Sequence, residues 1–127
     1  MIDTSVLIDL GVIDADELPR QVAVTAISMA ELAAGPHASS SPHERARRQD
    51  RLQRAEATFN PLPFDGDAAR AYGRIYAAIV AGGRKARGAR AIDLLIAATA
   101  LAADLPLYTR NADDFRGLEQ LITVVAI

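Results

Sequence analysis

The sequence has no cysteine, only two histidines and no long run of apolar residues. The absence of cysteine excludes disulfides, thiolate zinc sites, iron–sulfur clusters and cysteine nucleophiles. His37 and His43 lie in or beside a stretch rich in serine and proline, so a histidine-based metal site is not expected. The longest strongly apolar stretch, Leu94 to Ala103, is too short to cross a bilayer, and the acid Asp3 argues against a signal peptide. We therefore expect a cytoplasmic protein that has no membrane partner.

The composition is typical of one globular domain. The 127 residues are 50% apolar and 24% charged, which leaves room for a single core of ordinary size, so we expect one domain over residues 1–127. The net charge of −2 is unevenly distributed along the chain. Residues 44–90 hold 11 basic and 5 acidic side chains, whereas the remainder holds 3 basic and 11 acidic ones. A basic middle is thus joined to acidic ends.

Two arginine-rich segments lie in this basic middle. We interpret the first, Arg45 to Arg54, as a solvated helix face, which is the usual role of such a charge run. The second contains glycine and has no acid nearby, which argues against a helix held by ion pairs. A basic loop of this kind suits phosphate, and its basic residues are Arg84, Lys85, Arg87 and Arg90.

Short apolar runs alternate with helical patterns along the chain. Strands are predicted at residues 1–2, 21–27, 62–64, 106–109 and 122–127. Helices are predicted from Ser28 to Ala34, from a cap at Ser41 toward Phe59, from a cap at Asp65 to Gly82, and from Ala91 to Ala103. The last of these is apolar on nearly every face and should lie deep in the domain. This order predicts an α/β fold with a parallel sheet covered on both faces.

Several acids fall where a predicted strand ends or a helix begins. Asp3 follows residues 1–2, Glu31 comes shortly after the strand that ends at Ile27, and Asp93 opens the apolar helix. The pair Asp113 and Asp114 lies just past residues 106–109. Because ligands of parallel sheets gather beyond the carboxyl ends of the strands, we expect these carboxylates to meet at one edge.

Each acid also has a purely structural interpretation. Ser28 and Glu31 form a capping-box pattern, in which Glu31 would hold only a backbone amide. Asp93 has the position of a helix cap or first-turn acid, and Asp3 that of a cap for a helix starting near residue 4. Residues 111–114 have the composition of a polar turn. None of the acids is diagnostic by itself, but four separate caps need not point to one place.

A cluster of carboxylates needs a cation. Two carboxylates about 4 Å apart repel by roughly 4 kcal/mol at an effective dielectric constant of about 20. Either some of them are protonated or a cation is bound. Without cysteine or a well-placed histidine, the ligands are hard oxygens, which favour Mg²⁺ or Mn²⁺. Such an ion beside a basic surface indicates chemistry on a phosphodiester.

Four segments together resemble a known family. Asp-Thr-Ser-Val-Leu-Ile at 3–8, Ser-Met-Ala-Glu-Leu at 28–32, Ile-Asp-Leu-Leu-Ile-Ala-Ala-Thr at 92–99 and Thr-Arg-Asn-Ala-Asp-Asp-Phe at 109–115 resemble, in order and spacing, the PIN-domain nucleases. Within them the chain is most similar to the VapC-like toxins of type II toxin-antitoxin pairs. The resemblance covers essentially the whole chain. It implies a three-layer α/β/α sandwich with a short parallel sheet, acting as an Mg²⁺- or Mn²⁺-dependent endoribonuclease.

The resemblance also implies roles for single residues and partners. Asp3 and Asp93 would be the principal metal ligands, and Glu31 would complete the pocket. The hydroxyls of Thr4 or Ser5 and of Thr109 would orient these carboxylates. Cleavage of RNA would leave a 5′-phosphate and a 3′-hydroxyl. Relatives commonly form homodimers and are silenced by a cognate antitoxin whose tail covers the pocket.

The sequence departs from the family pattern in two places. A fourth acid often follows the Thr-Arg pair, where this chain has Asn111; we take Asp114 as its substitute in preference to Asp113. Relatives also usually have several more apolar residues before the first acid, which suggests a natural start upstream of Met1. A catalytically silent PIN-like interaction module is the main alternative, although it would be expected to have lost one of the three principal acids. A phosphoacceptor receiver domain is a weaker one, because the only lysine, Lys85, lies in the basic loop.

Overall fold

The computed structural model describes residues 1–88 and 90–127 in full. Its five α-helices are α1 (Thr4–Ile8), α2 (Ala26–Ala34), α3 (Pro42–Thr58), α4 (Gly66–Ala81) and α5 (Ala89–Ala102). Three short 3₁₀ turns are η1 (Ala15–Glu17), η2 (Gly35–Ala38) and η3 (Ala112–Phe115). The two strands are β1 (Leu107–Thr109) and β2 (Val124–Ala126). In the described residues, no helix is long and apolar enough to cross a membrane.

The centre of the fold is a short parallel sheet. Strands β1 and β2 pair in parallel, with Leu107 opposite Val124. The N-terminal segment extends this pairing through one bridge, because Ile2 lies parallel to Tyr108. The Asp3 N–H donates to the Tyr108 carbonyl at 3.0 Å. The chain therefore leaves the sheet at Asp3, at the same edge where β1 ends at Thr109.

Two further extended segments continue the sheet beyond residues 1–3. The Ile2 N–H donates to the Ala23 carbonyl at 2.9 Å, and Thr25 forms a parallel bridge with Leu62. The predicted parallel sheet is thus confirmed, but the predicted strands at 21–27 and 62–64 are each reduced to a single paired residue. The first is shorter because the chain turns into α2 directly after Thr25.

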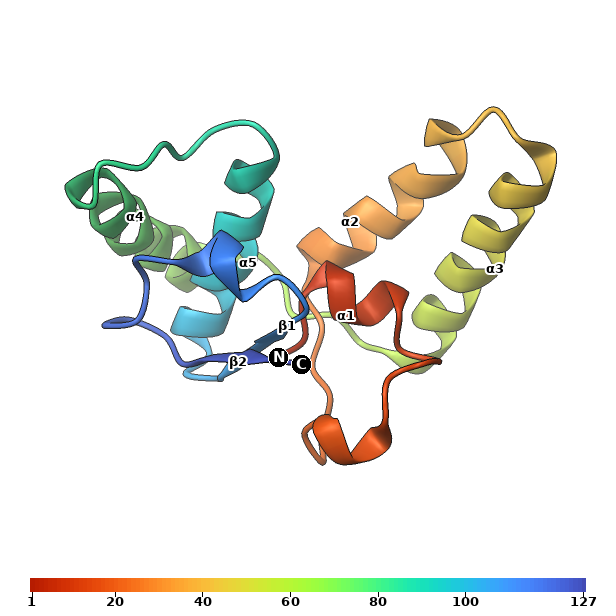
Figure 1. The fold of residues 1–127 in the computed structure, drawn as a ribbon, viewed down its shortest axis with the longest axis horizontal. Helices are drawn as coiled ribbons and strands as arrows, with labels where there is room; N and C mark the ends of the chain where they lie inside the picture. The colour runs from red at the N-terminus through yellow and green to blue at the C-terminus, as the bar shows by residue number, and fades with distance from the viewer.

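Helices cover both faces of the sheet, as predicted. Side chains alternate along each extended segment, so Met1 and Leu107 pack with α4 and α5, whereas Ile2 and Tyr108 pack with α1, α2 and α3. Figure 1 shows α4 and α5 on one side of β1 and β2, with α1, α2 and α3 on the other. The architecture is the three-layer α/β/α sandwich expected from the sequence.

Helix α5 is deeply buried in the hydrophobic core that it forms with α4. Leu94 and Ile96 are fully buried, which confirms the depth predicted from its composition. The predicted start at Ala91 is wrong, since the helix begins at residue 89. It follows Gly88, which has a φ of 69°, a conformation that L-residues rarely adopt. Asp93 is consequently the fifth residue of α5 and lies past its first turn.

Helix α2 also begins earlier than predicted. Its N-cap is Thr25, whose Oγ1 accepts a hydrogen bond from the Ser28 N–H at 2.9 Å. Ser28 is therefore inside the helix, and the capping-box interpretation of Ser28 and Glu31 is wrong. Glu31 lies in the second turn, where its side chain is not required for capping.

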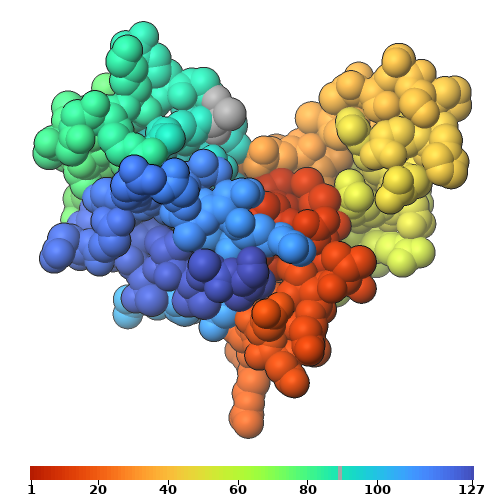
Figure 2. All heavy atoms as spheres, in the orientation of Figure 1, coloured from red at the N-terminus to blue at the C-terminus, as the bar shows by residue number. Residues whose placement is uncertain are grey.

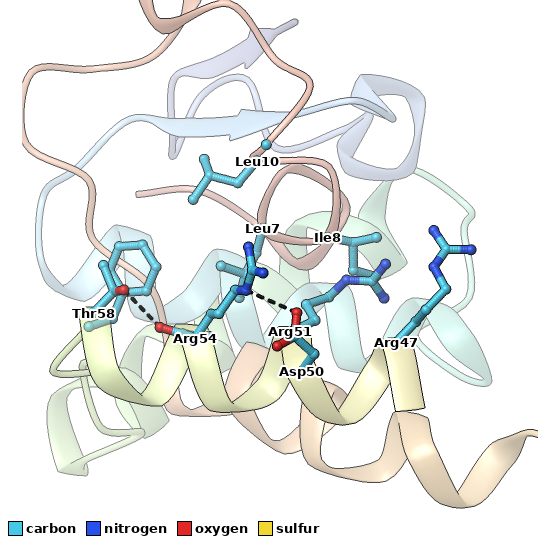
Figure 3. Close-up of a pocket in the computed structure, with 11 residues that line it drawn as sticks. Leu7, Ile8, Leu10, Arg47, Asp50, Arg51, Arg54 and Thr58 are labelled. Carbon is cyan, nitrogen blue, oxygen red and sulfur yellow. Dashed lines mark hydrogen bonds and ion pairs between the residues drawn. The ribbon is translucent and has the colours of Figure 1, made fainter. Parts of the chain in front are cut away.

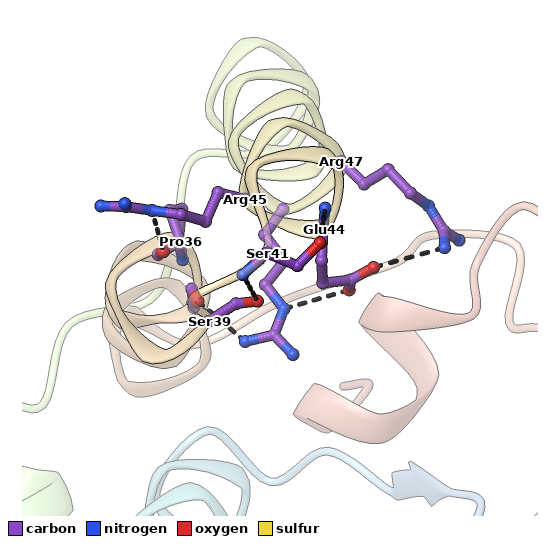
Figure 4. Close-up of polar contacts among 8 residues, drawn as sticks. Pro36, Ser39, Ser41, Glu44, Arg45 and Arg47 are labelled. Carbon is purple, nitrogen blue, oxygen red and sulfur yellow. Dashed lines mark hydrogen bonds and ion pairs between the residues drawn. The ribbon is translucent and has the colours of Figure 1, made fainter.

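Helices α2 and α3 are joined through η2 by arginine side chains (Figure 4). The Arg45 Nε donates to the Pro36 carbonyl at 3.2 Å, and the Arg48 Nη1 donates to the Gly35 carbonyl at 2.9 Å. Ser41 caps α3 as predicted, but Glu44 does not return the bond and pairs with Arg48 at 3.1 Å. These bonds hold α2 and α3 as one unit.

Candidate active site

Asp3 is a buried carboxylate held by donors from two elements. It caps α1, as one interpretation of the sequence predicted, because its Oδ1 accepts from the Val6 N–H at 3.1 Å. The Ser5 Oγ donates to the same oxygen at 2.6 Å. The Thr109 Oγ1, at the end of β1, donates to Oδ2 at 2.5 Å. Only 4% of Asp3 is exposed, so these bonds set the orientation of a charged group that is almost out of solvent.

Glu31 is held from α1. The Thr4 Oγ1 donates to the Glu31 Oε1 at 2.5 Å and lies 2.9 Å from the Ser28 Oγ. Ser28 is fully buried and precedes Glu31 by three residues, which places both on one face of α2. Sequence reasoning missed Ser28 as part of this contact, although its spacing from Glu31 was the available signal. Thr4 therefore orients Glu31, whereas Ser5 and Thr109 orient Asp3.

Asp93 is electrostatically coupled to three other acids. Its pKa is raised from 3.8 to about 6, first by burial and then by the charges of Asp114, Glu31 and Asp3; Arg90 opposes this rise. These three acids therefore lie within electrostatic range of Asp93. Because it lies beyond the first turn of α5, the interpretation of Asp93 as a cap is wrong. We call Asp3, Glu31, Asp93 and Asp114 the acidic site.

The segment after β1 brings Asp114 to this site. Residues 112–115 form η3, which confirms the predicted turn. Asp113 is exposed and pairs with Arg116, so its charge is engaged away from the site. Asn111 is exposed, and its backbone N–H donates to the Thr109 Oγ1 at 3.0 Å. Of these three positions, Asp114 alone has a charge that raises the Asp93 pKa.

The predicted basic loop divides into two parts. Lys85 and Arg87 are exposed in the connection before α5, whereas Arg90 lies inside the helix, which corrects the prediction of a loop through residue 90. The Arg84 Nη1 donates to the Arg116 carbonyl at 2.8 Å. Loss of hydration lowers the Arg84 pKa, as do the charges of Arg90 and Arg116, while Asp114 raises it. Basic groups therefore adjoin the acidic site.

Most of the chain matches one family, the PIN domain, over residues 1–120. The chain belongs to the PIN domain family. This confirms the resemblance drawn from the four segments.

Named relatives of this PIN domain are bacterial. It is 35% identical over 130 aligned positions to Ribonuclease VapC5 of Mycobacterium tuberculosis, covering 100% of this chain and 93% of the relative. The crystal structure of VapBC-5, a member of the VapBC family of toxin-antitoxin systems from M. tuberculosis, superposes with a TM-score of 0.86 at 34% identity, covering 99% and 96% of the two chains. FitAcB from Neisseria gonorrhoeae superposes with a TM-score of 0.75 at 26% identity, covering 98% and 94%.

The donor set of the PIN domain suits a hard divalent cation. Its carboxylates offer only oxygen, and Asp93 forms no hydrogen bond through its side chain among the described residues. Within residues 1–88 and 90–127, no three acidic or histidine side chains are spaced to hold an ion together. This is compatible with Mg²⁺, which usually binds one or two carboxylates and keeps several waters. A bound cation would relieve the repulsion between Asp93 and the neighbouring carboxylates.

The molecular surface has a hollow between the α4–α5 half and the α2–α3 half, as Figure 2 shows. Of the four acids, Glu31 lines a hollow of about 420 Å³ between α1, α2 and α3, together with Thr4. A second hollow of about 520 Å³, between α1 and α3, contains none of the four acids (Figure 3). The hollow lined by Glu31, rather than the larger one, is therefore the one that adjoins the acidic site.

Proposed function

We propose that this PIN domain is an Mg²⁺- or Mn²⁺-dependent endoribonuclease that serves as the toxin of a toxin-antitoxin pair. The observation that carries the proposal is the convergence of charge on Asp93 from Asp114, Glu31 and Asp3, which come from separate parts of the chain. The similarity to Ribonuclease VapC5 supports RNA as the substrate. The expected products carry a 5′-phosphate and a 3′-hydroxyl.

Asp3 and Asp93 are the proposed principal metal ligands, and Glu31 completes the pocket. Asp114 takes the fourth acidic position. When bound, the cation supplies charge neutralisation at the phosphodiester and acidifies a water molecule. The carboxylate of Asp3 approaches this role with its orientation already set, because Ser5 and Thr109 donate to its two oxygens at 2.6 and 2.5 Å.

Glu31 has a separate proposed task. Its Oε1 accepts from the Thr4 hydroxyl, while no hydrogen bond engages its Oε2 among the described residues. Oε2 is therefore available to accept a proton or a hydrogen bond from the attacking water. The Thr4 hydroxyl keeps the carboxylate turned toward the hollow that both residues line.

The basic residues beside the site are proposed to hold the RNA backbone. Arg84, Lys85 and Arg87 precede α5, and Arg90 lies in its first turn. The Arg90 Nη1 is buried and has no hydrogen-bond partner among the described residues. A buried guanidinium nitrogen without an acceptor is unfavourable, and a phosphate oxygen would satisfy it.

Two protein partners are also proposed. VapBC-5 and FitAcB are similar in structure, and the first is described as a toxin-antitoxin system, which supports a cognate antitoxin for this chain. A homodimer is proposed because Tyr76 and Val80 are 48% and 51% exposed on α4. Self-association would cover this apolar face.

The test is cleavage of a panel of structured RNAs by the purified protein. We expect cleavage with Mg²⁺ or Mn²⁺ and none with EDTA. Asp3→Asn and Asp93→Asn should each reduce the rate by at least about a hundredfold, because each removes a ligand charge at the reacting phosphate. Glu56→Gln is the matched control. Glu56 is an exposed carboxylate on α3 and is far in sequence from each of the four acids, so this variant should keep the wild-type rate.

Product ends identify the chemistry. Ligation-based or mass-spectrometric mapping should detect 5′-phosphate and 3′-hydroxyl termini. Cleavage that continues in EDTA, or in both asparagine variants, would refute a metal-dependent mechanism at these residues. Products with a cyclic phosphate would refute water as the nucleophile.

A further inference from the structure

Among the described residues, one arginine of the arginine-rich helix α3 has no hydrogen-bond or ion-pair partner. Of its five arginines, Arg45 and Arg48 bond to carbonyls of η2, as Figure 4 shows for Arg45. Arg47 pairs with Glu44 at 3.4 Å, and Arg54 pairs with Asp50 at 2.9 Å. Arg51 forms no hydrogen bond or ion pair through its side chain among residues 1–88 and 90–127. Arg45, Arg47 and Arg54 are exposed, in agreement with the solvated face predicted for this run, whereas Arg51 is partly buried.

Arg51 is partly buried, and Figure 3 shows it extending from α3 toward Ile8 of α1. Among the described residues, none of its nitrogens is a buried atom that lacks a partner, so the guanidinium is open to solvent and to an anion. The fork of donors on arginine matches the oxygens of a phosphate or a carboxylate.

Arg51 lines two hollows. One is the hollow of about 520 Å³ between α1 and α3, and the other is the hollow of about 420 Å³, which it shares with Glu31, Thr4, Ile8 and Leu32. This volume is within the range of small-molecule sites and can take a nucleotide unit. Glu44 also lines the hollow, but Arg47 and Arg48 pair with its carboxylate. Arg51, which has no partner among the described residues, thus shares a hollow with Glu31, the carboxylate proposed to act on the attacking water.

We infer that this hollow is a nucleotide subsite in which Arg51 binds a backbone phosphate of the RNA strand next to the cleaved bond. The inference rests on the proposed ribonuclease function and extends it to the α2–α3 half of the molecule. The segment between α4 and α5, which holds the proposed contacts, belongs to the half of the molecule opposite α2 and α3 (Figure 1), so the strand would be held from both sides. The apolar side chains of Ile8 and Leu32 offer a surface for the ribose or base.

The test compares Arg51→Ala and Arg51→Lys with the wild type. In steady-state cleavage, Arg51→Ala should raise KM about tenfold, as expected for one lost charge-assisted contact, and should change kcat much less. Arg51→Lys keeps the charge and should recover most of the loss. Arg70→Ala is the control for net charge, because Arg70 is exposed and pairs with Asp67 on α4. It should keep the wild-type KM.

A binding measurement makes the result independent of cleavage. The affinity for a labelled single-stranded RNA is measured in EDTA at increasing salt concentrations. Loss of one phosphate contact should reduce the slope of log affinity against log salt by about 0.7. Thermal melting of each variant shows whether the fold is intact.

The outcomes separate this inference from the proposed function. If the wild type cleaves no RNA, the proposed function fails, and the salt slope in EDTA still decides the role of Arg51. If Arg51→Ala keeps the wild-type KM and salt slope, the inference is refuted while the nuclease stands. Equal losses in the alanine and lysine variants with a lowered Tm would assign Arg51 a structural role. Loss of antitoxin binding with unchanged RNA binding would refute the inference in favour of a protein carboxylate as the ligand.

Discussion

Replacement of Asp93 by asparagine should stabilise the metal-free protein while it abolishes cleavage. Asp93 is ionised at neutral pH in a place where burial and the charges of Asp114, Glu31 and Asp3 all oppose ionisation. Asparagine has nearly the same shape and no charge, so it removes this repulsion. An active-site variant that is more stable than the wild type is the expected sign of a functional charge cluster.

The size of the effect follows from the pKa of Asp93. A rise from 3.8 to about 6 corresponds to an upper limit of roughly 3 kcal/mol in the free energy of unfolding. Asp93 is only partly buried, and solvent screening reduces this to about 1–2 kcal/mol. For a chain of this length, the Tm should rise by about 3–8 °C.

The pH dependence of stability independently tests the sign of the change in Asp93→Asn. Because the folded-state pKa is the higher one, the folded wild type binds more protons than the unfolded chain between about pH 4 and pH 6. The contribution of Asp93 to the free energy of unfolding is therefore fully present below pH 4 and is lost as the pH rises to 6. Asp93→Asn lacks this loss, so the two proteins should differ little at pH 4 and by the full amount above pH 6.

The assay is thermal and chemical unfolding in EDTA across this pH range. Glu56→Gln, an exposed charge-neutralising substitution on α3, is the control and should change the Tm by less than about 1 °C. A variant that is less stable than the wild type at pH 7, or a stability difference that does not vary between pH 4 and 6, would refute the argument that repulsion at Asp93 is uncompensated.

Two other changes test the same site. Addition of Mg²⁺ should raise the Tm of the wild type in proportion to the logarithm of its concentration, and this shift should disappear in Asp93→Asn; an equal shift in both would place the ion elsewhere. Thr109→Val removes the hydroxyl that donates to the Asp3 Oδ2 and should lower the free energy of unfolding by about 1–3 kcal/mol. Thr109→Ser should restore most of this loss in a urea titration, whereas an unaffected valine variant would show that the bond contributes nothing.

Local signals in the sequence were sufficient for the long helices. Ser41 and Asp65 cap α3 and α4 as predicted, because a cap bonds to a backbone amide only three residues away. The alternation of short apolar runs and helices likewise predicted the layered fold. The four motifs in register identified the PIN domain family before any contact was known.

Element boundaries near the site were decided by tertiary structure. Helix α2 starts at Ala26 because Thr25 is fixed in the sheet by its bridge to Leu62, a residue far along the chain. Helix α5 starts at residue 89 after a glycine with positive φ, which no local pattern distinguishes from an ordinary loop glycine. Because both helices begin earlier than predicted, Glu31 and Asp93 do not cap them, and their side chains are free for other contacts.

The sequence by itself determined the residue types at the site: carboxylates without cysteine or suitable histidine, flanked by arginines. Only the folded chain determined which of them meet, since Thr109 reaches Asp3 across 106 positions and Thr4 reaches Glu31 across 27. The same holds for the unpaired Arg51, because the partners of its neighbouring arginines lie partly in another element. Hydrogen bonds and charge repulsion act over a few ångströms in space, and the distance between residues far apart in sequence is set by packing.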